Sequence, residues 1–243
     1  FPGEGQGSTL EHAWIAYGGS GCWAPVSIYD DDVTIRHSEM AHSNANAVLY
    51  VENSSPVIEW NSIHHGTFGG VWIRQMDAAH PTSPTFTGNV VQDNARGFDV
   101  EGTRTAVLRD NAIFNSLWEG LRYQRTSWDT CGQTPCATRL DARHNWWGDA
   151  SGPYEINRNP HGTGDTIGDY PVHHAIDFIP WLDRPAPGTV PIDALTLGLS
   201  SAPHVSPGED HVYRIYVANY RDLPDPTVRD TVVGDGCKID NLV

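Results

Sequence analysis

The sequence predicts an all-β protein built mainly as a parallel β-helix, in which each coil of the chain stacks on the coil before it. Two observations indicate this fold. Short runs of alternating apolar and polar residues, which are typical of strands, recur along the chain. The same order of residue types also returns in each unit, so like residues fall into register between coils. An antiparallel sandwich also has closely spaced strands and is the rival interpretation, but it does not require that register.

The repeat is clearest in four segments between residues 35 and 123. Each has an apolar anchor, a Ser or Asn three positions later, a second apolar residue after five, and then a small residue before an apolar-x-apolar strand. The anchors are Ile35, Ile58, Phe86 and Leu108, the polar residues are Ser38, Asn61, Asn89 and Asn111, and the small ones are Ala47, Gly70, Gly97 and Gly120. Leu10 and Ile15 fit the first half of the same frame. We expect the Asn side chains to stack at corners, where they accept left-handed backbone and hydrogen-bond along the column.

The repeats end in "HNWWGDASGPY", followed later by "DFIPWL". With the frame, this ending resembles the right-handed parallel β-helix repeat family of bacterial secreted and cell-surface proteins, over roughly residues 8–184. The resemblance implies the fold and leaves activity open, because lyases, hydrolases, adhesins and structural proteins share it. Leu140 begins a further coil, and we expect Trp146, Trp147 and Trp181 to cover the last one, within a cap at residues 139–184. A sugar-binding platform is the alternative for these tryptophans.

The composition changes after the predicted β-helix of residues 1–184. Residues 185–191 are rich in proline and predict a linker. Residues 192–243 hold three strand-like runs, and "SPGEDHVYRIYVANY" resembles the opening half of immunoglobulin-like repeat modules of bacterial surface proteins. A complete sandwich needs about seven strands. We therefore expect a partial module, in a chain that is cut or whose strands pack on the solenoid or on another subunit.

Charge and cysteine content restrict the partners and the compartment. The net charge is −15 and Lys238 is the single lysine, which excludes nucleic acid as an expected partner. No apolar stretch is long enough for membrane insertion. No signal peptide is visible at the start, as is also true of a processed or truncated chain. Cys131 and Cys136 in "CGQTPC" favour a local disulfide and a secreted or cell-surface location, with metal binding as the alternative.

Two groups of residues are metal-site hypotheses, although we expect no cofactor to be required. Seven positions after the anchors, His42, His65 and Asp93 fall on successive coils, followed by Asn115, so two or three of them would share an ion. Asp30, Asp31 and Asp32 form a calcium hypothesis. A solvated polar turn is the alternative in both places.

Other outward residues predict contacts rather than chemistry. Trp60 and Trp72 are the expected contact surface for carbohydrate or another subunit. We expect Arg36 to pair with Glu59, and Asp99 with Arg122, as aids to coil register. Asn53 lies in a sequon for N-glycosylation.

These patterns favour an extracellular, non-catalytic structural or cell-surface protein. We expect it to assemble head to tail with other copies of itself into a fibre, or to engage a neighbouring surface domain. The alternative is a secreted polysaccharide lyase or hydrolase of the pectin-degrading type, with Glu101, Asp110 and Glu119 as further carboxylates. The absence of lysine from the solenoid and of a "GHG" segment paired with "R-x-K" disfavours that alternative. A glycan-binding adhesin is the third hypothesis, and we assign no catalytic residue.

Overall fold

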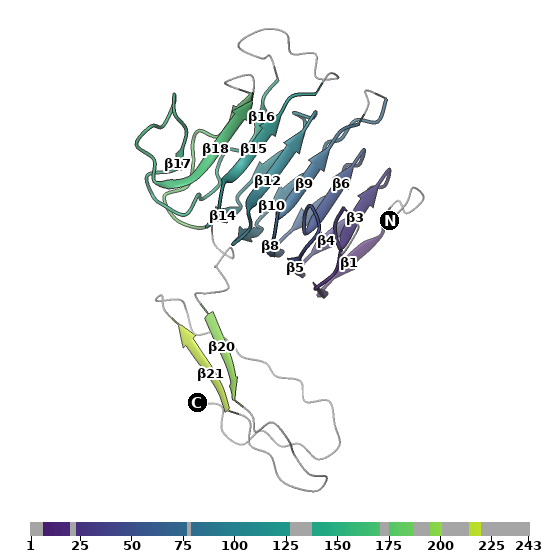
Figure 1. The fold of residues 1–243 in the computed structure, drawn as a ribbon, viewed down its shortest axis with the longest axis vertical. Helices are drawn as coiled ribbons and strands as arrows, with labels where there is room; N and C mark the ends of the chain where they lie inside the picture. Colours follow the sequence, from purple (N-terminus) through teal and green to yellow (C-terminus); the bar gives the residue numbers. More distant parts are fainter. Residues whose placement is uncertain are drawn as a thin grey trace, which may run out of the picture. The chain divides into compact units, whose positions relative to one another are not determined.

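The computed structural model describes residues 7–19, 23–76, 79–126, 138–170, 175–186, 195–200 and 214–219. The chain divides into two compact units, Phe1–Pro191 and Ile192–Val243. The first unit is a parallel β-solenoid of about five turns, and Figure 1 shows its strands stacked side by side along the sequence. None of the described residues belongs to a helix long and apolar enough to cross a membrane.

Three sheets form the walls of the solenoid, because every complete coil contributes one strand to each. The first sheet contains β1 (Thr9–Glu11), β4 (Thr34–Arg36), β7 (Val57–Glu59), β10 (Thr85–Thr87), β13 (Val107–Arg109), β16 (Leu140–Asp141) and β19 (Ile176–Asp177). The second contains β2 (Trp14–Ala16), β5 (Glu39–Ser43), β8 (Ser62–Gly66), β11 (Val90–Gln92) and β14 (Ala112–Phe114). The third contains β3 (Val26–Tyr29), β6 (Leu49–Glu52), β9 (Val71–Arg74), β12 (Arg96–Glu101), β15 (Glu119–Gln124), β18 (Gly164–Tyr170) and β17 (Pro153–Tyr154).

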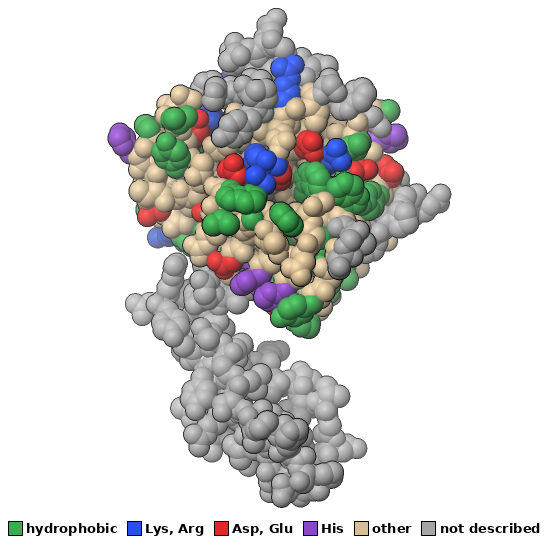
Figure 2. All heavy atoms as spheres, viewed as in Figure 1, with side chains coloured by type: hydrophobic (Ala, Val, Ile, Leu, Met, Phe, Trp, Pro, Cys, Tyr) green, Lys and Arg blue, Asp and Glu red, His purple; other side chains and the backbone are tan. Residues whose placement is uncertain are grey.

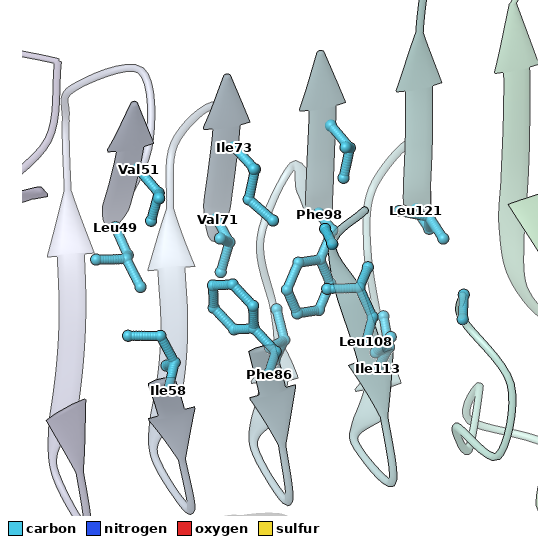
Figure 3. Packing of buried hydrophobic residues seen from close by; sticks show 14 of the residues in the cluster. Leu49, Val51, Ile58, Val71, Ile73, Phe86, Phe98, Leu108, Ile113 and Leu121 are labelled. Carbon is cyan, nitrogen blue, oxygen red and sulfur yellow. The ribbon is translucent and has the colours of Figure 1, made fainter. Parts of the chain in front are cut away.

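The apolar residues of the predicted frame fill the interior of the solenoid. The strand register pairs each anchor with the next, as in Ile35 with Ile58 and Phe86 with Leu108. All four anchors are fully buried, and Figure 3 shows the later ones following one another inside the solenoid. The rings of Phe86 and Phe98 meet edge to face at 5.2 Å. Stacked coils thus bury the inward residues that one coil alone would leave in water.

A ladder of buried asparagines runs beside this core, and it confirms the predicted column. Its members are Asn61, Asn89, Asn111 and Asn145, with Ser38 in the same position one coil earlier. Each Asn Oδ1 accepts a hydrogen bond from the backbone N–H of the preceding member. Each Nδ2 donates to an anchor carbonyl of the preceding coil, as Asn89 does to Ile58 at 2.8 Å. Buried backbone groups at the corner are thereby satisfied.

The left-handed backbone lies one residue earlier than the sequence prediction placed it. His37, Trp60, Asp110 and His144 have φ between 50° and 58°, and each directly precedes a member of the ladder. The ladder asparagines are not among the residues with positive φ. The chain therefore turns at the residue before the asparagine, whose amide stays aligned for bonding between coils.

Trp146 and Trp147 were predicted to cover the last coil together, but the structure places them on opposite sides of the chain. Trp146 bridges Ala112 in parallel register, so residues 145–147 occupy a strand position of the last coil. Trp147 consequently points inward and is fully buried in the main core, whereas Trp146 packs outside against Phe114. Trp181 is half-buried against the core, its ring stacks 6.3 Å from that of Phe178, and its Nε1 donates to the Ala150 carbonyl. The end of the core is thus closed by Trp147 with Phe178 and Trp181.

Only two strands of the second unit are described. β20 (Leu195–Ser200) and β21 (Arg214–Asn219) pair in antiparallel register. The third predicted strand and most of the linker at residues 185–191 lie outside the described residues. The immunoglobulin-like module therefore stays a prediction.

Candidate functional site

Three histidines come together at one corner of the solenoid. His42 belongs to β5, and His64 and His65 belong to β8 on the next coil. One ring nitrogen from each lies within 4.8 Å of the other two. Across the described part of the chain, no other group of three His, Cys, Asp or Glu side chains is this close. Figure 2 shows histidine side chains gathered over the edge where β5 and β8 lie.

The backbone at the corner explains how two consecutive histidines face one another. Successive residues of a strand point to opposite faces. His65 has a φ of 56°, however, and this left-handed turn ends the alternation immediately after His64. The two Nδ1 atoms consequently lie 2.6 Å apart. His42 has a φ of 55° in the same corner position one coil earlier, and its ring centroid lies 4.7 Å from that of His65.

The surroundings of His64 favour its neutral form. Burial lowers the pKa of His64, and Glu39 opposes this change. The nearby rings of His65 and His42 lower the same pKa further. The Glu39 Oε1 atom lies 3.2 Å from His64 Nε2 and also accepts a hydrogen bond from Trp14 Nε1 at 3.2 Å. A neutral imidazole keeps one nitrogen lone pair, which a metal ion or a hydrogen-bond donor requires.

The close group differs from the predicted set of His42, His65 and Asp93 in one member. The register does stack Asp93 on His65, because Gln92 pairs with His64. Asp93 nevertheless lies one coil further on, where its Oδ1 accepts from Asn115 Nδ2 at 3.2 Å, and it is not part of the close group. His64 takes its place. The sequence signal for His64 was its position directly before His65, but strand alternation alone predicts that the two side chains point to opposite faces.

The aspartates of the calcium hypothesis serve the turn between β3 and β4. Asp31 is buried and its Oδ1 accepts from the backbone N–H of Asp32 at 2.8 Å. Asp32 Oδ1 accepts from the backbone N–H of Ser55 on the next coil at 2.7 Å. Asp30 is exposed and left-handed, with a φ of 48°. The structure does not gather the three carboxylates into a close group, and calcium binding stays a prediction.

An aromatic face covers the start of the third sheet and consists of Trp23, Tyr29, Tyr50 and Trp72. The Tyr50 and Trp72 ring centroids lie 5.2 Å apart, and Trp23 meets Trp72 at 5.5 Å. The Arg74 guanidinium lies 5.5 Å from the Trp72 ring. In Figure 2, hydrophobic side chains lie beside charged side chains of both signs on the face over β6, β9, β12 and β15. Trp72 is thus one member of a cluster rather than an isolated exposed ring.

The other predicted residues that the structure describes lie apart from the three histidines and from the aromatic face. Trp60 is 41% exposed at a left-handed corner and packs over Gly88, where an added Cβ would lie 2.6 Å from its ring. Asn53 is half-buried and its Oδ1 accepts from the Met76 backbone N–H at 3.0 Å. Cys131 and Cys136 lie outside the described residues, so the disulfide stays a prediction.

The comparisons with known proteins concern the solenoid. A family model described as "Right handed beta helix region" matches residues 5–127, just over half of the 243 residues. No curated protein and no solved structure matches the chain. The family match covers the four anchors, the ladder from Ser38 to Asn111 and the three histidines, and it ends before Asn145. The chain therefore belongs to the family of proteins with a right-handed β-helix region.

Proposed function

We propose that the chain is a non-catalytic structural protein of an extracellular surface, a stiff module that joins other copies of itself. The observation that carries this proposal is that charged side chains on the outer face of the third sheet form ion pairs between neighbouring coils. Arg122 Nε donates to Asp99 Oδ1 at 2.9 Å, and Arg96 Nε donates to Glu119 Oε2 at 2.9 Å. Both pairs join the fourth coil to the fifth.

Further pairs continue this pattern to other coils. Arg74 pairs with Glu101 at 3.0 Å between the third and fourth coils. The predicted pairing of Arg36 with Glu59 is wrong, because Arg36 pairs with Glu11 on the preceding coil instead. An exposed pair of this kind contributes less than about 1 kcal/mol. The carboxylates Glu101 and Glu119 of the enzyme hypothesis already bind arginine, which supports a role in holding register over a role in cleaving a glycosidic bond.

The first coil supports association with a second copy. Among the described residues, β1, β2 and β3 each form the edge of one sheet. Leu10 and Ile15 are only half-buried there, whereas Ile35 and Met40 one coil later are fully buried. Trp14 and Tyr17 beside them are 66% and 75% exposed. Strand pairing by another chain would satisfy the edges and cover these apolar groups.

Two measurements test this proposal. Negative-stain microscopy of the purified chain should show ordered fibres, which Leu10→Lys should abolish because a charge at the edge opposes pairing. Leu117→Lys is the matched control, since Leu117 is 75% exposed on the side of the solenoid. Monomers at every protein concentration, or release of unsaturated or reducing sugars from acidic polysaccharide, would overturn the proposal.

The aromatic face favours glycan binding as a second candidate function. The exposed ring of Trp23 and the half-buried rings of Tyr29 and Trp72 lie beside charged groups and offer the stacking and hydrogen-bonding contacts that sugars require, whereas Tyr50 is fully buried beneath them. Trp72→Ala should abolish binding on a glycan array. Trp118→Ala is the control, because Trp118 is an exposed tryptophan that is not a member of the aromatic face, and it too has an arginine beside its ring, the Arg96 guanidinium at 4.5 Å. Equal binding by the two variants would exclude the aromatic face as the sugar site.

A further inference from the structure

We propose that His42, His64 and His65 bind one zinc ion, which ties the second coil of the solenoid to the third. The proposal goes beyond the structural function, because it gives one corner a ligand. It rests on the close approach of three ring nitrogens from two coils. His42 supplies the second coil's ligand and the other two histidines supply the third coil's ligands.

The chemistry of the donor set selects the class of metal. Imidazole nitrogens suit zinc and the other late divalent transition metals, whereas calcium and magnesium require oxygen ligands. Three protein ligands also leave one position of a tetrahedral zinc ion open. Zinc is therefore the ion to test first, and calcium should not compete for the site.

The ring nitrogens must shift in two directions to accept the ion, because those of His64 and His65 lie too close together while the widest pair of the group lies up to 4.8 Å apart. Two nitrogens bound to a tetrahedral zinc at about 2.0–2.1 Å lie roughly 3.3 Å apart. The Nδ1 atoms of His64 and His65 lie 2.6 Å apart, so their rings must separate by less than about 1 Å. Without an ion, one of these two nitrogens has to donate a proton to the other.

Glu39 provides the positioning contact that zinc-binding histidines usually have. Its Oε1 lies 3.2 Å from His64 Nε2, which leaves His64 Nδ1 directed toward His65. Trp14 Nε1 donates to the same oxygen and holds the carboxylate in place. A carboxylate that accepts the second ring N–H fixes the tautomer and orientation of a metal-binding histidine.

Gln92 adds an independent observation beside the site. It lies in register with His64 on the next strand, and its side chain is 97% buried. Its Oε1 has no hydrogen-bond partner within the described residues. A buried acceptor without a donor is costly. This oxygen therefore needs a donor that the described residues do not supply, such as a water molecule.

The fold itself does not require histidine at these positions. Asp93 and Asn115 adopt the same left-handed corner conformation on the two following coils. Gln92 likewise occupies the strand position that His64 has on the preceding coil. These neighbours supply substitutions that keep the backbone geometry while removing the imidazole. The variants are His42→Asn, His64→Gln and His65→Asn.

Equilibrium dialysis against zinc alone, after stripping with EDTA, tests the proposal on the full chain. The unmodified protein should bind zinc at this site, and its melting temperature should rise with zinc. Each histidine variant should lose more than about 100-fold in zinc affinity, and Glu39→Gln about 10–100-fold. His37→Asn is the matched control, because His37 occupies a left-handed corner outside the group, and it should bind as the unmodified protein does.

Two results would overturn the assignment. One is an unmodified protein that retains no zinc after dialysis. The other is unchanged zinc affinity in His64→Gln with a circular dichroism spectrum that shows a folded protein. Unchanged affinity would place the bound zinc at other histidines. Neither result bears on fibre formation, which the Leu10→Lys experiment measures separately.

Discussion

Replacing Asn89 by alanine removes one rung of the asparagine ladder, and we expect it to destabilise the solenoid strongly. Asn89 is fully buried. Its Oδ1 accepts from the backbone N–H and the Nδ2 of Asn61, at 3.0 and 3.1 Å. Its Nδ2 donates to the Ile58 carbonyl at 2.8 Å and to Asn111 Oδ1 at 3.0 Å. The alanine variant leaves the partners in the interior without these bonds.

The expected magnitude follows from counting the backbone groups that lose a partner. The Asn61 N–H and the Ile58 carbonyl lose the bonds to Asn89, and each unsatisfied buried group costs about 1–3 kcal/mol. The Thr87 carbonyl also loses a bond to Asn89 Nδ2 but still accepts from the Trp60 N–H, so it is not counted. Asn89→Ala should therefore lower the free energy of unfolding by about 2–6 kcal/mol. Serine should recover part of this loss. Ser38 shows how, since its Oγ accepts from the Ala13 N–H and donates to the Arg36 carbonyl, both at 3.0 Å.

Urea unfolding followed by circular dichroism measures both variants, with the slope m as the check on two-state behaviour. Asn89→Ser should lie between the unmodified protein and Asn89→Ala. Amide exchange at Asn61 should accelerate in the alanine variant more than in the serine variant. If serine and alanine destabilise equally, or if both cost less than about 1 kcal/mol, the ladder does not stabilise the fold by satisfying buried backbone groups.

Three further predictions concern packing and charge. Gly97→Ala should lower the free energy of unfolding, measured by urea titration, by about 1–3 kcal/mol, because the added Cβ would lie 2.4 Å from the Gly120 carbonyl oxygen. Gly69→Ala is the control and should lower it less, because its Cβ would lie 3.3 Å from the nearest atom. Trp147→Ala should cost about 3–5 kcal/mol in the same assay and Trp60→Ala much less, since Trp147 is fully buried. Burial raises the pKa of Asp165 to about 6, although hydrogen bonds from Ser116 and Asn115 oppose this change. The folded protein therefore holds this proton more tightly than the unfolded chain does, and the free energy of unfolding falls as the pH rises from about 4 to above 6. Asp165→Asn should therefore raise the melting temperature at pH 8 but not at pH 4, with a gain of up to about 3 kcal/mol; an equal effect at both pH values would contradict the raised pKa.

The sequence frame predicted the interior well because stacking forces like residues into register. Ile35, Ile58, Phe86 and Leu108 follow one another as the frame requires. The same frame extends further than the sequence prediction took it. Ala142, Asn145 and Trp147 repeat the anchor, the ladder residue and the second apolar residue. Their spacing in the sequence matches the frame, but the glycine-rich residues that follow indicate a turn, so the prediction ended the coil there.

The candidate metal site was harder to predict, because the frame describes strands and the site is at a corner. Strand alternation directs His64 and His65 to opposite faces, and the left-handed φ of His65 ends that alternation. The sequence does not show where a non-glycine residue adopts this conformation. The wrong prediction of Glu59 as the partner of Arg36 has a similar cause, because the frame gives the register but not the side-chain conformation. Arg36 has an acidic register neighbour on both sides, Glu11 and Glu59, and alignment alone does not select between them.

The corner is also where a solenoid has the greatest freedom to acquire a new site. A change at an inward position such as Ile58 alters the core of neighbouring coils, because fully buried residues have no room to adapt. A corner side chain such as His42 is only half-buried, while its neighbours Ala41 and Ser43 pair with the next coil. Tyr17, Asp93 and Asn115 occupy the same corner position on other coils with the same sign of φ. Two histidines on adjacent coils can therefore meet without any change in the interior, so the variants His42→Asn and His65→Asn, which remove a zinc ligand, should retain the fold.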